Sequence, residues 1–584
     1  MIERNAKLIT RKFYQYLIPS VLMIFAMQFG SLLDGIIIGN TIGSAALSAT
    51  SLVMPVLYVI QVPGFALGVG GSIVVANLLG KRDLNRASKV FSASLIYGTA
   101  ISAVFSVIAP FVSGPLATLF AETLYDYSYG YILVYMLVNP IMMLAIMVAS
   151  FISTDNNPKI SALLYVVATA IKVGSEILFI SVFGMGIIGA ALSTGVGYGL
   201  ALIVVVFYAY SKKRMLKFTF NLKGIAADLK NAVKAATSTA LMYLLMAVQT
   251  FIINVVLSNL ITDELDLIIF GLVSNLLFVF ELLSGGILGV IPNVCGVLYG
   301  EKDTFSLKSV ARKIYIINIC VCAFITALIL AFPSIYAAAF GFTESGEALK
   351  RADYMIRIFV LCAIPLEINK FSINYYPSVG KNFPAILTVI LRDALLVIPL
   401  SLWLMKTDGL FGYSIAHVIT EIAAILITYA VITVINVKGK RTHGIFMIEK
   451  TDFKSFDVTV ENKPENAAII SEKITEFAIG SGVSNRNAQV VGLAAEEMVA
   501  NVIEYGYKKQ KPNYIDVNVK VGDGELILRL RDDGMPFDPT KYDFEKDENY
   551  TTIGIGMITK LSDEITYLRL LNLNNTVIKI KTGE

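Results

Sequence analysis

The sequence predicts an all-α polytopic membrane region followed by a water-soluble α+β domain, and three observations support this prediction. First, 56% of the 584 residues are hydrophobic and only 16% are charged, whereas about 25% are charged in ordinary soluble proteins. Second, apolar segments recur from residue 13 to about residue 436. Third, the composition changes abruptly after residue 437 to a mixture of polar and apolar residues, over a length typical of one soluble domain.

The apolar segments are about 20 residues long or longer, which is enough to cross the hydrocarbon core of a bilayer. They are expected to be helices, because lipid cannot satisfy the polar groups of any other backbone conformation. The first follows basic residues but lacks a cleavage site, so we interpret it as a membrane span and not as a leader. We place twelve spans, at residues 13–38, 47–78, 90–113, 130–153, 160–182, 187–210, 237–260, 265–298, 311–340, 350–380, 384–405 and 410–436.

The charges of the short loops predict the orientation. With the N-terminus inside, the inner loops include several that are rich in lysine and arginine, and the outer loops include acidic or neutral ones. The basic loops and both termini are therefore expected in the cytoplasm, with the chain in the plasma membrane. The basic loops are 80–89, 211–220, 300–313 and 437–443, and the outer loops include 121–130 and 262–266. The net charge of +4 does not by itself predict a nucleic-acid partner.

An internal repeat divides the membrane region into two halves. "LLGKRD" at 78–83 resembles "LYGEKD" at 298–303, and each copy follows the second span of its half. Duplicated halves are common in transporters. We therefore predict two six-helix lobes, at 1–210 and 237–436, joined by a basic linker at 211–236. A second basic linker, 437–450, leads to the soluble domain, 451–584.

The membrane region resembles the multidrug and toxin extrusion (MATE) transporters. The resemblance is carried by "LLDGIIIGNTIGSAALSATSLVMP" (32–55), "FGMGIIGAALST" (183–194) and "GVIPNVCGVLYGEKD" (289–303), and it covers roughly residues 10–436. It implies a V-shaped pair of lobes and cation-driven export of organic, often cationic, molecules. It also implies an ion site inside the N-terminal lobe.

Four residues match that ion site. Asp34 lies where the family has its ion-binding aspartate, and Thr194 matches a threonine hydroxyl near the site. In the fifth span the family usually has an asparagine followed four residues later by an aspartate; here those positions are Lys172 and Glu176. A charge near the bilayer centre costs about 2.5–3.5 kcal/mol, so each needs a reason.

Lys172 changes the expectation for the coupling ion. An ammonium between Asp34 and Glu176 would supply the positive charge that sodium brings, and it leaves a formal charge of about −1 that one proton could neutralise. A proton relay or an ion-independent lobe therefore fits better than sodium coupling. The alternative is structural: Lys172 and Glu176, spaced i and i+4, share a helix face and could neutralise one another.

The soluble domain has the element order of an α+β fold with helices on one face of an antiparallel sheet. Alternating residues predict strands, and apolar residues at i, i+3 and i+4 predict helices. The expected elements are a strand at 455–461, helices at 466–482 and 485–507, a hairpin at 513–534 turning at 522–524, a glycine loop and short helix at 552–565, and two strands at 565–581.

Polar residues and glycines in this domain point to nucleotide chemistry. Glu497 and Asn501 lie four apart on one helix face, as a general base and an oxygen ligand for Mg²⁺. Asp532 follows a strand, where it can accept a hydrogen bond from an adenine amine. Gly554 and Gly556 lie at a helix start, where exposed amides favour phosphate.

Together these motifs resemble the GHKL ATPase superfamily, and most closely the anti-sigma-factor serine kinases. The resemblance implies that Glu497 is the base, Asn501 the Mg²⁺ ligand and Asp532 the adenine contact. It also implies that Gly534, Gly554 and Gly556 bind phosphate. The cofactors that it implies are ATP and Mg²⁺. Thr551 and Thr552 replace glycines common in the family, which puts lid mobility and turnover in question.

Two functions remain open. The first is a MATE-like antiporter regulated by a cytosolic ATP-binding domain. The second is a membrane receptor that senses a ligand through the transporter fold, with the tail acting as a serine kinase or sequestering a partner. Both imply a small organic molecule, the lipid bilayer and a cytosolic regulatory protein as partners, and neither implies nucleic acid.

Two other classes are disfavoured. A histidine kinase needs a phosphoacceptor on a dimerising helical pair, and the linker of about 15 residues around His443 is too short for one. ATP-powered pumping is disfavoured because the sequence has no G-x-x-x-x-G-K-[ST] loop.

Overall fold

The computed structural model describes residues 4–211, 213–260, 264–340, 342, 345–440, 442–449, 453–507, 512–522, 524–541 and 553–582. The chain divides into two compact units. The helical unit is Gln15–Ile448, and the α+β unit is Glu449–Glu584 together with Met1–Tyr14.

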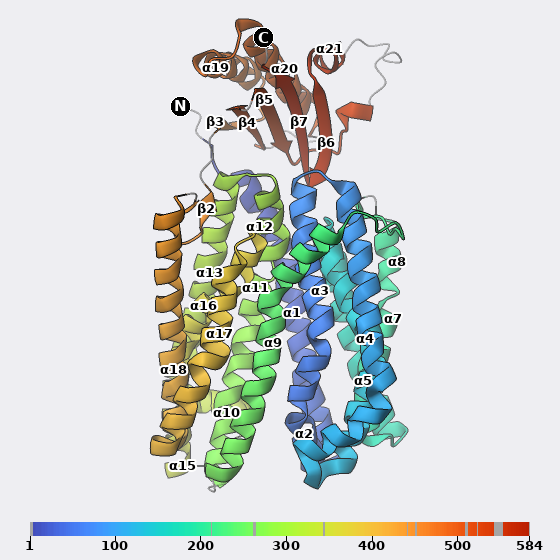
Figure 1. The fold of residues 1–584 in the computed structure, drawn as a ribbon, viewed down its shortest axis with the longest axis vertical. Helices are drawn as coiled ribbons and strands as arrows, with labels where there is room; N and C mark the ends of the chain where they lie inside the picture. The colour runs from blue at the N-terminus through green and yellow to red at the C-terminus, as the bar shows by residue number, and fades with distance from the viewer. Residues whose placement is uncertain are drawn as a thin grey trace. The chain divides into compact units, whose positions relative to one another are not determined.

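The helical unit consists of long helices that run side by side (Figure 1). Its first half contains α1 (Lys7–Thr41), α2 (Ser44–Leu52), α3 (Met54–Gly80), α4 (Leu84–Ala121), α5 (Tyr125–Thr154), α6 (Pro158–Ile177), α7 (Gly186–Ala201) and α8 (Val204–Ala209). Its second half contains α9 (Ala226–Leu260), α10 (Glu264–Phe280), α11 (Gly286–Leu288), α12 (Ile291–Gly300), α13 (Thr304–Ala331), α14 (Pro333–Ala339), α15 (Glu347–Phe359), α16 (Ala363–Ser378), α17 (Asn382–Ile390) and α18 (Val397–Gly439).

The predicted helical membrane fold is confirmed, and each of the twelve predicted spans falls on helical structure. Among the described residues, nine helices are long and apolar enough to cross a membrane. One of them, Asn382–Gly439, contains two predicted spans, separated where Gly409 leaves helical geometry (φ 56°, ψ −135°). The two remaining spans are interrupted helices, α10–α12 by a π turn at Glu281–Gly285 and α15–α16 by a 3-10 turn at Val360–Cys362.

The two copies of the repeated motif pack against each other symmetrically. A Cβ atom on Gly80 would lie 2.3 Å from the carbonyl oxygen of Val297, and one on Gly300 would lie 2.2 Å from that of Asn77. Gly80 corresponds to Gly300 in the repeat, and Asn77 corresponds to Val297, so the two contacts are equivalent. The backbones of α3 and α12 therefore touch at a point where no side chain fits, which supports the predicted duplication.

The turns that follow these glycines also match. Arg82 and Lys302 both adopt positive φ, of 66° and 54°. In both copies the next residue, Asp83 or Asp303, accepts a hydrogen bond through Oδ1 from the backbone N–H three residues later, at 3.0 and 3.2 Å. These aspartates cap the helices that follow.

The α+β unit contains a five-stranded antiparallel sheet with the order β3-β4-β5-β7-β6. Its elements are β3 (Lys454–Glu461), α19 (Glu465–Gly480), α20 (Asn485–Tyr505), β4 (Tyr514–Gly522), β5 (Glu525–Asp532), α21 (Ile553–Leu561), β6 (Glu564–Leu570) and β7 (Leu573–Lys581). Short strands β1 (Thr442–His443) and β2 (Ile448–Glu449) pair with each other. The predicted α+β fold is confirmed.

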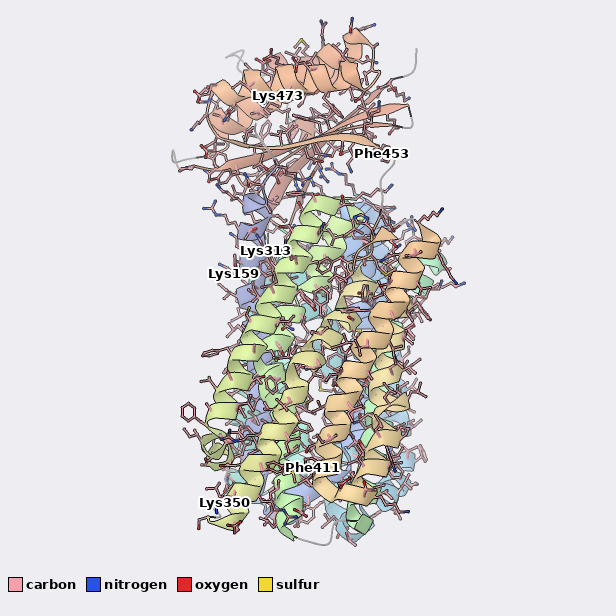
Figure 2. All side chains as sticks on the ribbon, turned by 90° about the vertical axis from the view of Figure 1, so that its left-hand side faces the viewer. Lys159, Lys313, Lys350, Phe411, Phe453 and Lys473 are labelled. Atoms are coloured by element: carbon pink, nitrogen blue, oxygen red, sulfur yellow. The ribbon has the colours of Figure 1, made fainter. Side chains whose placement is uncertain are left out.

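Helices α19 and α20 cover one face of this sheet, and Lys473 lies on this helical layer (Figure 2). The side chains between the layers are apolar, among them Val458, Val517 and Leu528, which are all at most 1% exposed. The two helices approach closely at Gly492, where a Cβ atom would lie 2.1 Å from Oγ1 of Thr475. The strand alternation places polar residues on the opposite face.

Candidate functional site

Glu497 and Asn501 lie on α20, which begins at Asn485 after the N-cap Ser484. The Asn501 side chain donates from Nδ2 to the backbone carbonyl of Glu497 at 2.7 Å, which fixes its orientation. Its Oδ1 atom accepts no hydrogen bond from the described residues. The side-chain oxygen of Asn501 is therefore available to bind a cation.

Helix α21 starts against the carboxylate of Glu497. A Cβ atom on Gly554 would lie 2.0 Å from Oε2 of Glu497, so only glycine fits unless this carboxylate moves. Gly556 lies in the same first turn of α21 and is partly buried. The structure thus brings together the predicted base and the predicted phosphate-binding glycines. Thr551 and Thr552, and the lid they belong to, lie outside the described residues.

Asp532 is the last residue of β5 and is 4% exposed. Its Oδ1 atom accepts from the backbone N–H of Gly534 and from Nδ2 of Asn574, both at 2.8 Å. The Oδ2 atom accepts no hydrogen bond from the described residues. One carboxylate oxygen is held in place and the other remains available to an amino group.

Asn574 is a residue that sequence reasoning did not identify. It lies opposite Asp532 in the β5–β7 register. Its Nδ2 atom also donates to the carbonyl of Met535 at 2.9 Å, and its Oδ1 atom accepts from Tyr567 at 2.8 Å and from Arg569 at 2.6 Å. Two adjacent asparagines at the start of a predicted strand were the available signal, but the register that pairs one of them with Asp532 is not visible in the sequence.

Gly534 is required by a close backbone approach. A Cβ atom there would lie 2.6 Å from the carbonyl oxygen of Gly506, at the C-terminal end of α20. The same carbonyl accepts from the N–H of Met535 at 2.8 Å. This contact holds the "DDGM" turn against the end of the helix that carries Glu497 and Asn501.

Burial raises the pKa of the Asp532 carboxyl from 3.8 to about 6, and the hydrogen bonds from Asn574 and Gly534 oppose that rise. The group is therefore ionised at neutral pH, at the expense of removing a charge from water. An ionised acceptor makes stronger hydrogen bonds than a neutral one.

These residues fit an adenine nucleotide with Mg²⁺. Among the described residues, no three His, Cys, Asp or Glu side chains are grouped to hold a metal by themselves. Mg²⁺ typically takes one or two protein oxygens and completes its shell with water and phosphate oxygens. The free Oδ1 atom of Asn501 meets that requirement, and the free Oδ2 atom of Asp532 suits an adenine amine.

In the helical unit, three helices bring the predicted ion-site residues together. Helix α1 packs on α6 where a Cβ atom on Gly30 would lie 2.8 Å from Cγ2 of Thr169. Helix α7 packs on α6 where a Cβ atom on Gly197 would lie 2.7 Å from Cβ of Lys172. Small residues at these crossings allow the close approach that buried charges require.

Lys172 forms an ion pair with Asp34, through Nζ and Oδ2. The ion pair that Lys172 forms among the described residues is with Asp34 on α1 and not with Glu176 on its own helix face; the alternative of mutual neutralisation by Lys172 and Glu176 stays a prediction. Glu176 is fully buried, and neither of its carboxyl oxygens has a hydrogen-bond partner among the described residues. The Oδ1 atom of Asp34 is also buried without a partner.

Thr194 lies on α7, three residues before Gly197 and therefore on the same helix face. It is 6% exposed. Its hydroxyl forms no hydrogen bond with the described residues. The structure places it one turn from the contact with Lys172 without joining it to the ion pair.

The second half of the helical unit holds its own buried ion pairs. Lys370 lies 2.6 Å from Glu281 and 3.2 Å from Glu367. Arg392 lies 2.7 Å from Glu421. Lys370 and Arg392 therefore each have an acidic partner.

Comparisons with known proteins match both units. The MatE family model matches residues 19–178 and 238–403, and a model described as a histidine kinase-like ATPase domain matches residues 460–581. The Multidrug export protein MepA of Staphylococcus saprophyticus is 24% identical over 422 residues, which cover 69% of this chain and 91% of that protein. The protein of the same description from Staphylococcus haemolyticus is 25% identical over 422 residues, with the same coverage.

Solved structures show the same fold. An outward-facing multidrug resistance MATE family transporter of the MOP superfamily has a TM-score of 0.66 at 17% identity, covering 74% of this chain and 97% of that chain. A MOP superfamily transporter from Pyrococcus furiosus, whose binding pocket is described as having reverse polarity, has a TM-score of 0.65 at 18% identity, covering 73% and 96%.

Proposed function

This chain belongs to the MatE family, and we propose that its helical unit exports organic small molecules in exchange for protons. We further propose that its α+β unit binds ATP with Mg²⁺ and regulates that transport. The description of the relatives as multidrug export proteins supports organic, drug-like substrates.

The buried carboxyl of Glu176 carries the transport proposal. An ionised carboxylate without hydrogen-bond donors is costly in a low-dielectric interior, so Glu176 needs a proton or a cation. Lys172 already neutralises Asp34. Loss of one proton from Glu176 therefore leaves a net charge of −1, which attracts an organic cation, and rebinding of the proton releases it.

The substrate and the proton would thus compete for the same charge. Lys172 lies between two acids: it pairs with Asp34 on α1, and Glu176 lies one turn along its own helix, α6, within reach of the same ammonium. A second positive charge at the site would expel the first. This competition is the requirement for antiport.

Transport is tested by efflux of a cationic dye from cells and from proteoliposomes with an imposed proton gradient. Glu176→Gln and Asp34→Asn should each abolish gradient-driven efflux, because each removes an acid from the exchange. Glu347→Gln is the matched control, since this carboxylate is exposed on α15, and it should transport normally. If neither the wild type nor any variant moves a substrate, the receptor function replaces this proposal.

The free Oδ2 atom of Asp532 carries the ATP proposal. It would accept from the adenine amine, while α21 would direct backbone amides toward the phosphates. Mg²⁺, held by Asn501 and phosphate oxygens, would neutralise phosphate charge. Glu497 can accept a proton from a nearby hydroxyl, such as that of a serine on a cytosolic regulatory protein.

ATP binding is tested by calorimetric titration of the full-length protein in detergent with Mg²⁺. Asp532→Asn and Asn501→Ala should each weaken binding at least tenfold, the latter only when Mg²⁺ is present. If the wild-type protein binds no nucleotide, the α+β unit is a docking module.

We also propose that the chain lies in the plasma membrane with both termini facing the cytoplasm, because the basic loops support this orientation and ATP is available there. Impermeant labelling of a tag at residue 584 from outside intact cells would contradict this orientation.

A further inference from the structure

The face of the sheet opposite α19 and α20 is polar. Asp457 and Thr459 on β3 lie opposite Asn518 and Asp516 on β4 in the register. Asn518 donates to Asp457 at 2.6 Å, and Thr459 donates to Asp516 at 2.8 Å. The sheet therefore carries a connected polar surface on the side opposite α19 and α20, in which Arg531 on β5 lies 3.5 Å from Asp516.

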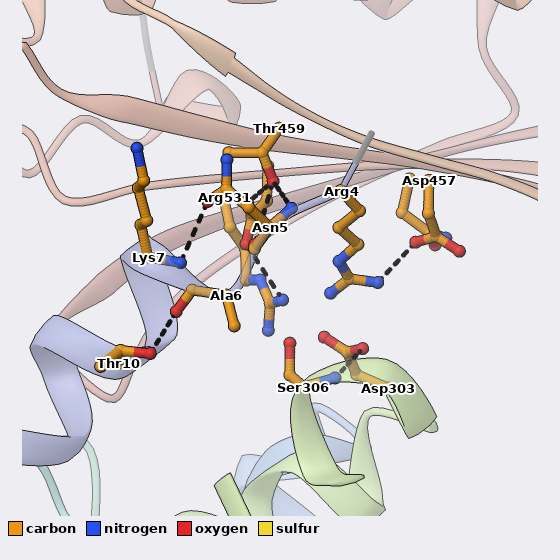
Figure 3. Close-up of polar contacts among 12 residues, drawn as sticks. Arg4, Asn5, Ala6, Lys7, Thr10, Asp303, Ser306, Asp457, Thr459 and Arg531 are labelled. Carbon is orange, nitrogen blue, oxygen red and sulfur yellow. Dashed lines mark hydrogen bonds and ion pairs between the residues drawn. The ribbon is translucent and has the colours of Figure 1, made fainter. Parts of the chain in front are cut away.

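The start of the chain lies on this surface (Figure 3). The backbone N–H of Asn5 donates to Oγ1 of Thr459 at 3.1 Å. Arg4 forms an ion pair with Asp457, with Nη1 at 2.5 Å from Oδ1. The Asn5 hydrogen bond fixes the position of the backbone on the sheet, and the Arg4–Asp457 ion pair requires a positive charge at residue 4.

The first turns of α1 continue these contacts toward the turn that follows β5. Lys7 donates to the Tyr514 hydroxyl at 2.8 Å and lies 4.6 Å from the centre of its ring. Arg11 lies 3.1 Å from Oδ2 of Asp533, and Lys12 lies 3.6 Å from the same atom. Lys7 and Arg11 lie one turn apart on α1, and they and Arg4, which precedes the helix, each meet an acidic or aromatic partner.

Asp533 is adjacent to Asp532, in the turn where the Oδ2 atom of Asp532 accepts no hydrogen bond from the described residues. Besides Arg11 and Lys12, the Tyr507 hydroxyl donates to Asp533 at 3.4 Å. The turn is therefore held from both sides, by the end of α20 and by the beginning of α1.

We propose that residues 4–12 form a docking segment that binds the polar face of the sheet and the Asp533 turn, and that it couples nucleotide binding to α1. Helix α1 runs from Lys7 to Thr41 and carries Asp34. The segment thus connects the turn beside the adenine contact to the helix of the ion pair. The coupling rests on the proposed ATP binding; the docking does not.

Coupling between two sites is reciprocal in binding free energy. If the docking segment holds the turn in its binding conformation, ATP must in turn strengthen the docking. Loss of Arg11 and Lys12 contacts should weaken ATP binding, because the turn must then be ordered by the nucleotide. The competing function for these four cations is binding of anionic lipid headgroups, in which case carboxylates on the sheet would not affect them.

The test is amide hydrogen exchange of the N-terminal peptide in the full-length protein, together with ATP titration. In the wild type, ATP with Mg²⁺ should slow exchange of residues 4–12. Asp533→Lys should speed that exchange without nucleotide and weaken ATP binding about three- to tenfold, as expected for loss of a partly buried ion pair. The pair Arg11→Glu with Asp533→Lys should restore part of both, because Lys12 still faces position 533.

Glu472→Lys is the matched control, because it reverses an exposed acid on α19, on the helical face of the unit. Thr459→Val removes the Asn5 hydrogen bonds without changing charge and should speed exchange of the same peptide. Unchanged exchange in α20 peptides would show that each variant is folded. If Asp533→Lys and Thr459→Val leave exchange of residues 4–12 unchanged, the docking is wrong. If ATP binds the wild type without slowing that exchange, the coupling is wrong; if the wild type binds no ATP, the proposed function fails while the docking result still stands.

Discussion

Replacing Asn574 with alanine should damage both the stability of the α+β unit and its affinity for ATP. The Asn574 amide takes part in four hydrogen bonds, to Asp532 (2.8 Å) and Met535 (2.9 Å), and from Tyr567 (2.8 Å) and Arg569 (2.6 Å). Each is worth about 1 kcal/mol net. Because Tyr567 and Arg569 are only partly buried, water can replace their share, so we expect a loss of about 2–3 kcal/mol.

The same substitution changes the titration of Asp532. The hydrogen bond from Asn574 lowers the pKa of that carboxyl against the effect of burial. Without it, the pKa rises above about 6. Since ATP is expected to bind the ionised form, wild-type affinity should decline as the pH falls through about 6, and in Asn574→Ala the decline should begin at higher pH.

Hydrogen exchange in β5 and β7 of the full-length protein measures the stability of the α+β unit. ATP titration between pH 5.5 and 8 measures the pH midpoint of ATP affinity. The control is Asn487→Ala, which removes a single exposed hydrogen bond, to the carbonyl of Lys581 at 3.1 Å. Equal destabilisation by the two variants, or a binding midpoint that does not move upward, would refute the reasoning.

Three further predictions follow from the same geometry. Asp532→Asn should stabilise the α+β unit by up to about 3 kcal/mol at pH 7.5 and should not stabilise it below pH 3.8. Folding raises the pKa of this carboxyl from 3.8 to about 6, so the ionised group destabilises the folded state as the pH rises. Urea titration followed by hydrogen exchange measures this, and equal effects at both pH values would contradict it. Gly534→Ala should cost about 1–3 kcal/mol, because its Cβ atom would lie 2.6 Å from a backbone carbonyl, whereas Gly480→Ala, with no atom within 4 Å, should be neutral in the same assay. Gly300→Leu should lower the melting temperature of the detergent-purified protein, because the side chain would meet the backbone of Asn77, and Gly439→Leu, which has open space, should not.

Composition and periodicity were sufficient to predict the element types. All twelve apolar segments and the elements of the α+β unit were found, because burial in lipid and on a sheet face each leave a periodic pattern. The breaks inside spans were not predicted. The π turn at Glu281–Gly285 and the 3-10 turn at Val360–Cys362 are local changes of helix geometry, which a 20-residue hydropathy pattern does not encode.

The candidate sites were predicted less completely for a related reason. Asp34 and Lys172 could be named from motif positions, but their pairing depends on how α1 and α6 cross. The partners of Asp532 and Asp533, namely Asn574 on β7 and Arg11 on α1, come from strand register and from a segment more than 500 residues away in the sequence. Neither relation can be obtained from local spacing.

The contact between Gly80 and Gly300 has a mechanical consequence for the proposed transport. At that point of the helical unit the two repeats meet main chain to main chain, so no side chain lies between the two backbones there. A solute could pass only if α3 and α12 move apart as whole helices, and a separation of a few ångströms would remove the entire contact at once. Access at this end is therefore expected to switch between fully shut and fully open, and a bulky residue at either glycine would act as a wedge.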